Sequence, residues 1–149
     1  MTTLAKNRKA FHDYEILEKF EAGIELQGTE VKSCRERNIS LADAHARVDE
    51  DGEIWVRGVH IAPYKHGNRE NHDPRRPRKL LLHKREIRDL KQATETKGMT
   101  LIPLRFYVKH RRVKVELGLC RGKARHDKRE TMKRKIHEQE AKQAMAKHR

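Results

Sequence analysis

Apolar residues recur at every second position in several stretches of the chain, and this period predicts β-strands. The first such stretch covers residues 14–26, where one parity is apolar and the other is mainly charged. Its apolar members are Tyr14, Ile16, Phe20, Ala22, Ile24 and Leu26. We expect a long strand with one buried face, bent or bulged near Gly23.

Two shorter runs form the clearest hairpin in the sequence. Residues 44–48 alternate between apolar and polar side chains, and residues 54–59 return as a second apolar run. Asp51-Gly52 lies between them, and this dipeptide favours tight turns that join antiparallel strands.

A further pair of strands is predicted near the end of the periodic region. Residues 102–108 and 113–120 alternate, with residues 109–112 as the turn between them. Pro103 has the opposite parity from the apolar positions of its strand, which predicts an edge strand because proline cannot donate to a ladder. Val113, Val115, Leu117 and Leu119 are expected to share one face, and Gly122 to let the backbone leave the sheet.

Two helices and one long loop are predicted between the strands. Within residues 28–35, Thr29 is placed to cap a short helix with Val31 and Cys34 on its inner face. Residues 83–97 are helix formers that end at Gly98, so this helix has the length to cover one open end of a barrel. Residues 63–78 contain three prolines and predict a surface loop.

These elements predict a mainly β protein. About five strands with one or two flanking helices fit a small, partly open β-barrel of the oligonucleotide-binding type. We expect three parts: a basic, loosely held N-terminal arm over residues 1–12, a body over residues 13–121, and a basic tail over residues 122–149.

The tail has the composition of a segment that folds only on binding. It carries ten Lys or Arg residues against four Asp or Glu, a net charge of +6, and no aromatic residue. Such a segment buries too little apolar surface to offset its ordering entropy, so we expect disorder in the free protein. A weak apolar stripe at helical spacing favours a helix in the bound state; it comprises Met132, Ile136, Ala141, Ala144 and Met145.

The overall charge indicates a polyanionic partner. The 149 residues carry a net charge of +14 with a pI near 10.1, which suits RNA, DNA or an anionic membrane surface. The chain has no apolar run near the roughly 18 residues of a membrane span, and its first residues lack the apolar stretch of a signal peptide. Membrane insertion and export are therefore not expected, and the cytoplasm is the expected compartment.

Three basic clusters, at residues 6–9, 75–79 and 121–135, carry the charge. Lysine and arginine side chains at phosphates release counterions and so bind RNA without reading its sequence. The alternative for any one cluster is a solvated face that keeps the protein soluble, but three separate clusters make this reading harder to sustain.

Enzymatic and metal-binding chemistry has little support in the sequence. His126-Asp127, and His66 with His72 and Asp73, are the nearest approaches to catalytic or metal-binding groups. Neither has a nucleophile or third ligand at recognisable spacing, so we expect no catalytic residue, metal or cofactor. Cys34 and Cys120 belong to no Cys-x-x-Cys pair, so neither a zinc site nor a disulfide framework is predicted.

A few polar and aromatic residues have two readings. His126 could stack on an unpaired base or be a solvated tail residue. Glu21 could accept hydrogen bonds from base or ribose donors, or pair with Arg or Lys. Trp55, Phe106 and Tyr107 are assigned to packing.

Several stretches together resemble the SsrA-binding protein family, also called small protein B. The segments that carry the resemblance are Asn7-Arg8-Lys9-Ala10 with Tyr14, residues 23–33, Asp73-Pro74 with Arg78-Lys79-Leu80-Leu81-Leu82, and Gly122-Lys123 with His126-Asp127-Lys128-Arg129. Ala124 stands where the family often has a second Lys, and Cys34 where it often has Leu.

The resemblance implies a non-enzymatic, monomeric adaptor for ribosome rescue by trans-translation. Its barrel would hold the tRNA-like domain of transfer-messenger RNA, and its tail would become helical in the empty messenger channel near the decoding centre. The alternatives left open are a ribosomal or general RNA-binding protein that acts without transfer-messenger RNA, and a hydrolase acting on RNA.

The resemblance and the basic clusters together give two sets of expected RNA contacts. The body set is Asn7, Arg8, Lys9, Glu21, Lys32, Arg75, Arg76, Arg78, Lys79 and Leu81. The tail set is Gly122, Lys123, Arg125, His126, Asp127, Lys128, Arg129, Lys133, Arg134, Lys135 and Met145.

Overall fold

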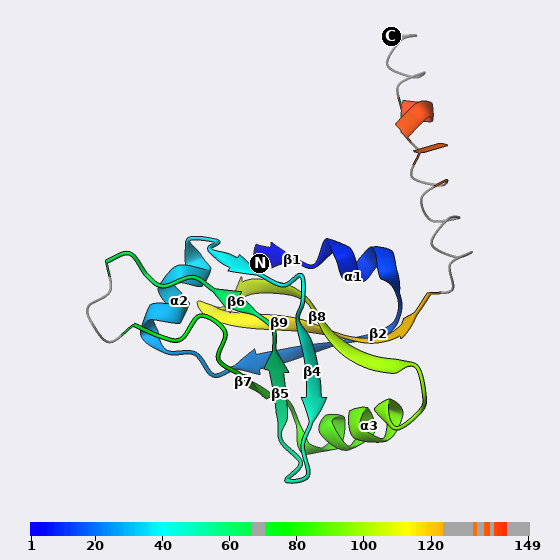
Figure 1. Ribbon diagram of the computed structural model, residues 1–149, viewed down its shortest axis with the longest axis horizontal. Coiled ribbons are helices and arrows are strands. Elements are labelled where there is room, and N and C mark those ends of the chain that lie inside the picture. The colour runs from blue at the N-terminus through cyan, green and yellow to red at the C-terminus, as the bar shows by residue number, and fades with distance from the viewer. Residues whose placement is uncertain (67–70, 124–132, 134–135, 138, 143–149) are drawn as a thin grey trace.

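The computed structural model of the protein describes residues 1–66, 71–123, 133, 136–137 and 139–142 (Figure 1). The strands are β1 (Thr2–Lys6), β2 (Tyr14–Ile24), β3 (Ile39–Ser40), β4 (His45–Val48), β5 (Ile54–Arg57), β6 (His60–Ile61), β7 (Arg78–Leu81), β8 (Met99–Lys109) and β9 (Arg112–Gly122). The helices of the body are α1 (Arg8–Asp13), α2 (Gly28–Arg35) and α3 (Lys84–Thr94).

The main sheet curls into a barrel. Its order is β1-β8-β4-β5-β7-β2-β9, and β8 also pairs with β9, so the sheet meets itself. The seam between β4 and β8 is held by a single register pair, Ala46 with Leu101. Helix α3 lies beside this seam and buries Leu90 in the core. The predicted mainly β, partly open barrel with few helices is therefore confirmed.

Local patterns located most elements correctly. The hairpin of β4 and β5 pairs His45 with Arg57 through Val48 with Ile54, as predicted. Helix α3 lies within the predicted stretch but ends at Thr94 with Glu95 as its C-cap, before the predicted stop at Gly98, which has a φ of +87° in the turn that leads to β8. Helix α2 lies in the predicted stretch, but it begins at Gly28 and not after Thr29, so the prediction of Thr29 as its cap is wrong. Gln27 is the N-cap, and the Glu30 side chain accepts its backbone N–H at 2.8 Å.

The N-terminal arm is an ordered part of the body, so the expectation that residues 1–12 are loosely held is wrong. Strand β1 pairs antiparallel with β8, and α1 follows it directly. Leu4 and Ala10 are both buried. The alternation is too short here to stand out in the sequence, and its partner strand lies about a hundred residues away.

Two β-bulges divide the interior into two clusters. One residue is inserted at Leu17 in β2 and another at Leu104 in β8. A bulge reverses the face that later residues present, because side chains alternate along a strand. Phe20 therefore packs in the main core, whereas Ile16 packs in a second cluster with Ala10, Ile102, Leu104 and Cys120. The bulge expected near Gly23 lies at Leu17 instead.

The prediction that Pro103 marks an edge strand is wrong, because β8 pairs with β9 on one side and with β1 and β4 on the other. The carbonyl of Pro103 accepts a hydrogen bond from the Asn7 side chain at 3.1 Å. The backbone N and O of a strand residue point to the same edge, so the missing N–H faces the gap between β4 and β1. No ladder hydrogen bond is lost there.

Strand β9 behaves largely as predicted. Val113, Val115, Leu117 and Leu119 all pack in the main core. Gly122 pairs with Tyr14 at the end of the strand, and a Cβ at Gly122 would meet no atom within 4 Å. The chain therefore does not need glycine on steric grounds to leave the sheet, contrary to our expectation.

Candidate nucleic-acid interface

A basic surface covers the outer side of β2, β9 and β8, opposite the core. We call it the basic face. Register pairs place Glu21 beside Glu116, Glu116 beside Arg105, and Lys114 beside both Gly23 and Tyr107. Its cations outnumber its two carboxylates; they are Lys19, Arg105, Lys109, Arg112 and Lys114. Such a surface suits a polyanion.

Glu21 lies within this face and is held in position. Its carboxylate accepts hydrogen bonds from the Tyr107 hydroxyl at 2.8 Å and from Lys109 Nζ at 3.0 Å. The hydrogen bond from Tyr107, followed by the one from Lys109, lowers the pKa of Glu21. Both readings of this residue are thus compatible: it pairs with a lysine, and its ionised carboxylate remains exposed as an acceptor for base or ribose donors.

Leu81 adjoins the basic face. It pairs in register with Gly23, two residues along β2 from Glu21, so Glu21 and Leu81 share one side of the sheet. Its side chain is 47% exposed, so it presents apolar surface beside the charged groups of this face. A Cβ at position 23 would lie 3.2 Å from the Leu81 Cβ, so Gly23 leaves room for this side chain.

Asn7 is buried rather than exposed for contact. Only 3% of its surface is accessible. Its amide donates to the carbonyls of Leu41 at 3.0 Å and Pro103 at 3.1 Å, and its side-chain oxygen accepts the Ala10 N–H at 3.1 Å. Asn7 therefore fixes β1 and α1 against the body. Its predicted role in RNA binding is reduced to that of a positioning residue.

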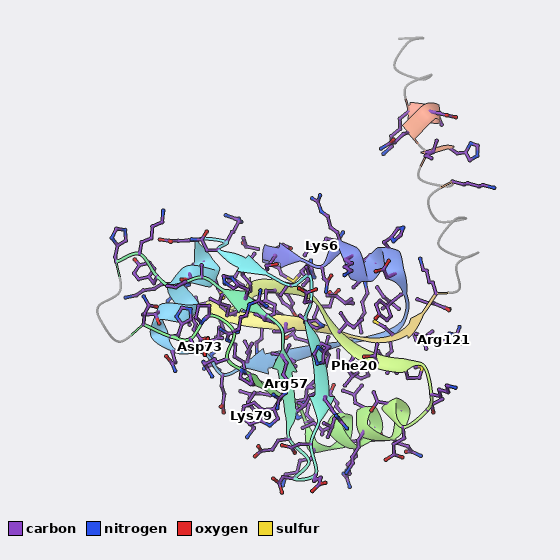
Figure 2. The ribbon with its side chains drawn as sticks, in the orientation of Figure 1. Lys6, Phe20, Arg57, Asp73, Lys79 and Arg121 are labelled. Carbon is purple, nitrogen blue, oxygen red and sulfur yellow. The ribbon has the colours of Figure 1, made fainter. Side chains whose placement is uncertain are left out.

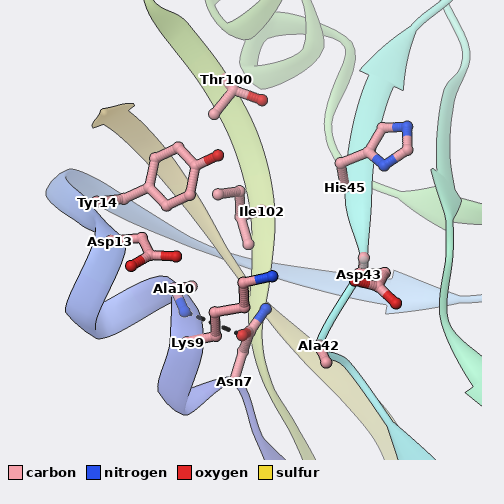
Figure 3. A pocket seen from close by; sticks show the side chains of 11 residues that line it. Asn7, Lys9, Ala10, Asp13, Tyr14, Ala42, Asp43, His45, Thr100 and Ile102 are labelled. Carbon is pink, nitrogen blue, oxygen red and sulfur yellow. Dashed lines mark hydrogen bonds between the residues drawn. The ribbon is translucent and has the colours of Figure 1, made fainter. Parts of the chain in front are cut away.

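A hollow of about 540 Å³ opens beside Asn7 (Figure 3). Lys9 and Tyr14 line it from one side and Asp43 and His45 from the other. The groups have both signs of charge and offer donors and acceptors, but no paired nucleophile and base. Lys6, Arg8 and Lys9, the cations of the N-terminal cluster, are all exposed, and a second hollow beside β1 and β3 is lined by all three.

The cluster at residues 75–79 is split by the fold. Arg75 is exposed, whereas Arg78 is fully buried. Arg78 donates to Glu30 Oε2 at 2.5 Å and to the Val59 carbonyl at 2.9 Å, and Arg76 also binds Glu30. No phosphate can reach the Arg78 guanidinium in this position, so we remove Arg78 from the expected RNA contacts.

Glu30 is the buried counter-charge that sequence reasoning missed. Burial by itself raises its pKa, but hydrogen bonds from Arg76, the Gln27 N–H and Arg78 outweigh it, and the net shift is downward. In the sequence, Glu30 is recognisable only as a glutamate at the third position of a helix. That position by itself indicates helix capping and not a buried ion pair.

The remaining cations of the body set lie apart from one another. Lys79 pairs with Glu53 at 3.2 Å, and Lys32 lies over the Tyr64 ring at 5.4 Å. Figure 2 shows Asp73, which precedes Arg75, near one end of the body and Arg121 near the other. The basic clusters of the sequence therefore do not merge into one patch.

Only part of the tail set falls within the described residues. The Lys123 N–H donates to the Asp13 carbonyl at 3.0 Å, which extends the contact between β9 and the N-terminal region. Lys133 is helical and exposed. The expected contacts Arg125, His126, Asp127, Lys128, Arg129, Arg134, Lys135 and Met145 lie outside the described residues.

The five cations of the basic face were missed in the sequence, although a signal for them exists as the polar parity of the strands. They are Lys19, Arg105, Lys109, Arg112 and Lys114. The assignment of Tyr107 to packing agrees with its burial, and its hydroxyl also holds Glu21. Outward positions on adjacent strands form a surface only once the register is known.

His72 and the two cysteines, which lie outside the basic face, are buried in the body. His72 is buried, with one ring nitrogen 2.9 Å from Thr29 Oγ1 and the other 2.8 Å from the Ile61 carbonyl. Burial raises the pKa of the Cys34 thiol to about 12 and that of Cys120 to about 11. Among the described residues, no group of three or more His, Cys, Asp or Glu could hold a metal ion.

The described helices include none that is long and apolar enough to cross a membrane.

Comparison with known proteins gives a consistent result. A family model described as "SmpB protein" matches residues 4–147. An SsrA-binding protein of Carboxydothermus hydrogenoformans is 54% identical over 142 residues, covering 95% of each chain. Another, of Pseudothermotoga lettingae, is 60% identical over 136 residues, covering 91% of this chain and 90% of its own.

A solved structure agrees with these relatives. It is described as "tmRNA-SmpB: a journey to the center of the bacterial ribosome", and one of its chains superposes with a TM-score of 0.69 and 51% identity. The match covers 86% of this chain and 93% of that chain. The likeness therefore extends over most of both chains.

Proposed function

The chain belongs to the SmpB protein family, and from that premise we propose that it binds transfer-messenger RNA and brings it to stalled ribosomes for trans-translation. The observation that carries the proposal is a family match that runs through body and tail alike. The relatives are named for binding SsrA RNA, and the solved relative is described with transfer-messenger RNA and the bacterial ribosome. The basic face supplies the surface that such a partner requires.

The protein acts in this role as an adaptor in the cytoplasm and makes or breaks no bond itself. Its body holds the tRNA-like domain of the RNA through the basic face, with Glu21 and Leu81 on the same side of the sheet. Arg8, Lys9, Lys32, Arg75, Arg76 and Lys79 add phosphate contacts around it. Asn7 contributes by positioning the N-terminal segment.

The tail binds a second RNA partner, the ribosomal RNA that lines the messenger channel near the decoding centre. Its cations and His126-Asp127 meet ribosomal RNA there, and Met145 serves after the tail has been accommodated. Its composition, with a net charge of +6 and no aromatic residue, supports binding to RNA over packing into the body.

Truncation tests this division of labour. A chain ending at Gly122 is expected to bind the tRNA-like domain with nearly unchanged affinity, because the basic face remains, while tagging of stalled chains stops. Filter binding and a reconstituted tagging assay measure the two activities. Loss of RNA binding in the truncated chain would refute the division, and retained tagging would refute the role of the tail.

Co-purifying RNA distinguishes this function from general RNA binding. We expect sequencing of the bound RNA at moderate salt to recover transfer-messenger RNA in excess. Recovery of ribosomal RNA alone would contradict the proposed function.

A further inference from the structure

The turn between β8 and β9 is built from residues that its backbone disfavours. His110 and Arg111 form a two-residue connection, with Lys109 and Arg112 paired on either side. Their φ angles are 51° and 64°. A turn with two positive φ values favours Asn-Gly, because a Cβ at positive φ crowds the following carbonyl; glycine has no Cβ, and the short asparagine side chain can compensate by a local hydrogen bond. The chain thus keeps two long side chains at a strained position.

The same turn concentrates positive charge. Lys109, His110, Arg111 and Arg112 are consecutive, and the last three are exposed. Within the described part of the chain, no carboxylate forms an ion pair with Arg111 or Arg112. Arg35, at the end of α2, adds a further cation, since its guanidinium donates to the Arg111 carbonyl at 3.2 Å. The packing of this turn against α2 therefore increases the local charge instead of neutralising it.

A shallow hollow connects the turn to the basic face. It measures about 260 Å³ and is lined by Leu26, Val31, Leu81 and Val113 together with cations of the hairpin. Those cations are Arg111, Arg112 and Lys114. The half-exposed Leu81 therefore lies in the same hollow as three positive side chains. An apolar floor with a cationic rim complements a nucleotide, whose base is a flat, weakly polar surface and whose phosphate is an anion.

We propose that this hairpin tip, residues 109–112 with Lys114, binds backbone phosphates of the folded RNA while an adjacent nucleotide covers Leu81. The inference rests on the proposed function and names a phosphate-binding element that extends the basic face. A lipid headgroup is the less suitable occupant, because the hollow continues into a face that also presents Glu21, an acceptor for nucleotide donors. The strain at the turn follows from retaining cations where they meet the RNA.

Replacing the turn by its preferred residues separates stability from binding. The double variant His110→Asn with Arg111→Gly removes the strain and one full positive charge. Its melting temperature should rise by roughly 2 to 6 °C, because positive φ values suit Asn and Gly. Its affinity for the isolated tRNA-like RNA at about 0.15 M salt should fall roughly fivefold, and the slope of log affinity against log salt should become shallower by about 0.7 to 1.

The single variants assign the effect to charge. His110→Asn should gain stability with little change in affinity, whereas Arg111→Gly should lose affinity and Arg111→Lys should retain most of it. Arg85→Gln is the matched control, because it removes one exposed charge from α3, at a distance from α2 and the turn in Figure 1. It should leave the affinity within about twofold, as expected for a single remote charge.

The outcomes distinguish this inference from the function on which it rests. Failure of the unmodified protein to bind the tRNA-like RNA would refute the proposed function. Binding by the unmodified protein that is unchanged in affinity and salt slope in the stable double variant would refute the phosphate site alone. Equal losses in Arg111→Gly and Arg85→Gln would also refute it, since net charge would then account for the effect. The two proteins can also be compared on anionic lipid vesicles. If the unmodified protein binds the vesicles more strongly than the double variant does, while both bind the RNA equally, the occupant is a membrane surface and the assignment is overturned.

Discussion

At the scale of single residues, two arginines only three positions apart have opposite environments. Arg75 is exposed and Arg78 is completely buried, although both belong to one basic run. Arg78 is stabilised in the interior only because Glu30 accompanies it, with backbone carbonyls of Val59 and Pro74 accepting its other N–H groups. A buried ion pair is weak evidence of net stabilisation, but removing one partner is costly.

Glu30→Gln is therefore expected to destabilise the fold by about 3 to 5 kcal/mol at pH 7, because it leaves a buried guanidinium without a counter-charge. Because the pKa of Glu30 is lowered in the folded protein, its contribution to the free energy of unfolding is present above the unfolded pKa of about 4.3 and is lost as pH falls through the folded value. Urea unfolding across this pH range should show the unfolding free energies of the unmodified protein and the Glu30→Gln variant converging as the pH falls. Glu18→Gln, at an exposed position, should change little, and equal stability of the Glu30 variant at pH 7 would contradict the assignment.

Asn7 gives a second test at this scale. Asn7→Ala removes three hydrogen bonds from buried partners and should cost about 2 to 4 kcal/mol of unfolding free energy. RNA binding should weaken along with stability and recover on cooling, because the residue acts by position. Lys9→Ala, at an exposed site, should weaken RNA binding with no loss of stability. Weakened binding by a fully folded Asn7→Ala chain at every temperature would indicate direct contact instead.

At the scale of elements, bulges decide which side of the sheet each side chain faces. Residues of one parity in β2 pack in two different clusters because Leu17 is inserted between them. The Leu17 side chain is 44% exposed. Leu17 therefore affects the fold mainly through its extra backbone unit and little through its side chain. The same device at Leu104 gives β8 a mixed set of inward residues.

Deleting Leu17 should accordingly be far more damaging than replacing it. Deletion would turn Tyr14 and Ile16 away from the second cluster and direct Glu15 into it, which should cost about 3 kcal/mol or more. Leu17→Thr should change the unfolding free energy by no more than about 0.5 kcal/mol, as expected at an exposed site. Thermal and urea unfolding of the two variants provide the comparison. Similar stability of both would show that β2 tolerates either register.

At the scale of the whole molecule, the body and the tail divide the positive charge. The body places five of its cations on the basic face around Glu21, whereas the tail carries a net charge of +6 in a segment without aromatic residues. Beyond Lys123, its described residues, which include Lys133 and Ile136, are exposed and helical. The two parts therefore suit two different RNA neighbours.

Salt dependence measures the first of these interfaces. For about six phosphates contacted by the body, log affinity against log salt on the tRNA-like RNA should have a slope of roughly −4. The chain ending at Gly122 should give nearly the same slope, because the tail contacts a different RNA. A flat dependence would argue against a phosphate-dominated interface, and a much shallower slope in the truncated chain would place tail cations on the same RNA.

The sequence by itself determined the strands of the β4–β5 and β8–β9 hairpins, two helices, the basic charge and the resemblance that led to the family. These features depend on local backbone preferences, on side-chain period and on composition, which need no knowledge of distant partners. Tertiary structure alone decided that β1 joins the barrel, and that the bulges at Leu17 and Leu104 reverse the face that later residues of each strand present. It also decided that Arg78 is buried in an ion pair with Glu30. It also assembled the basic face, because register between strands far apart in the chain determines which outward side chains become neighbours.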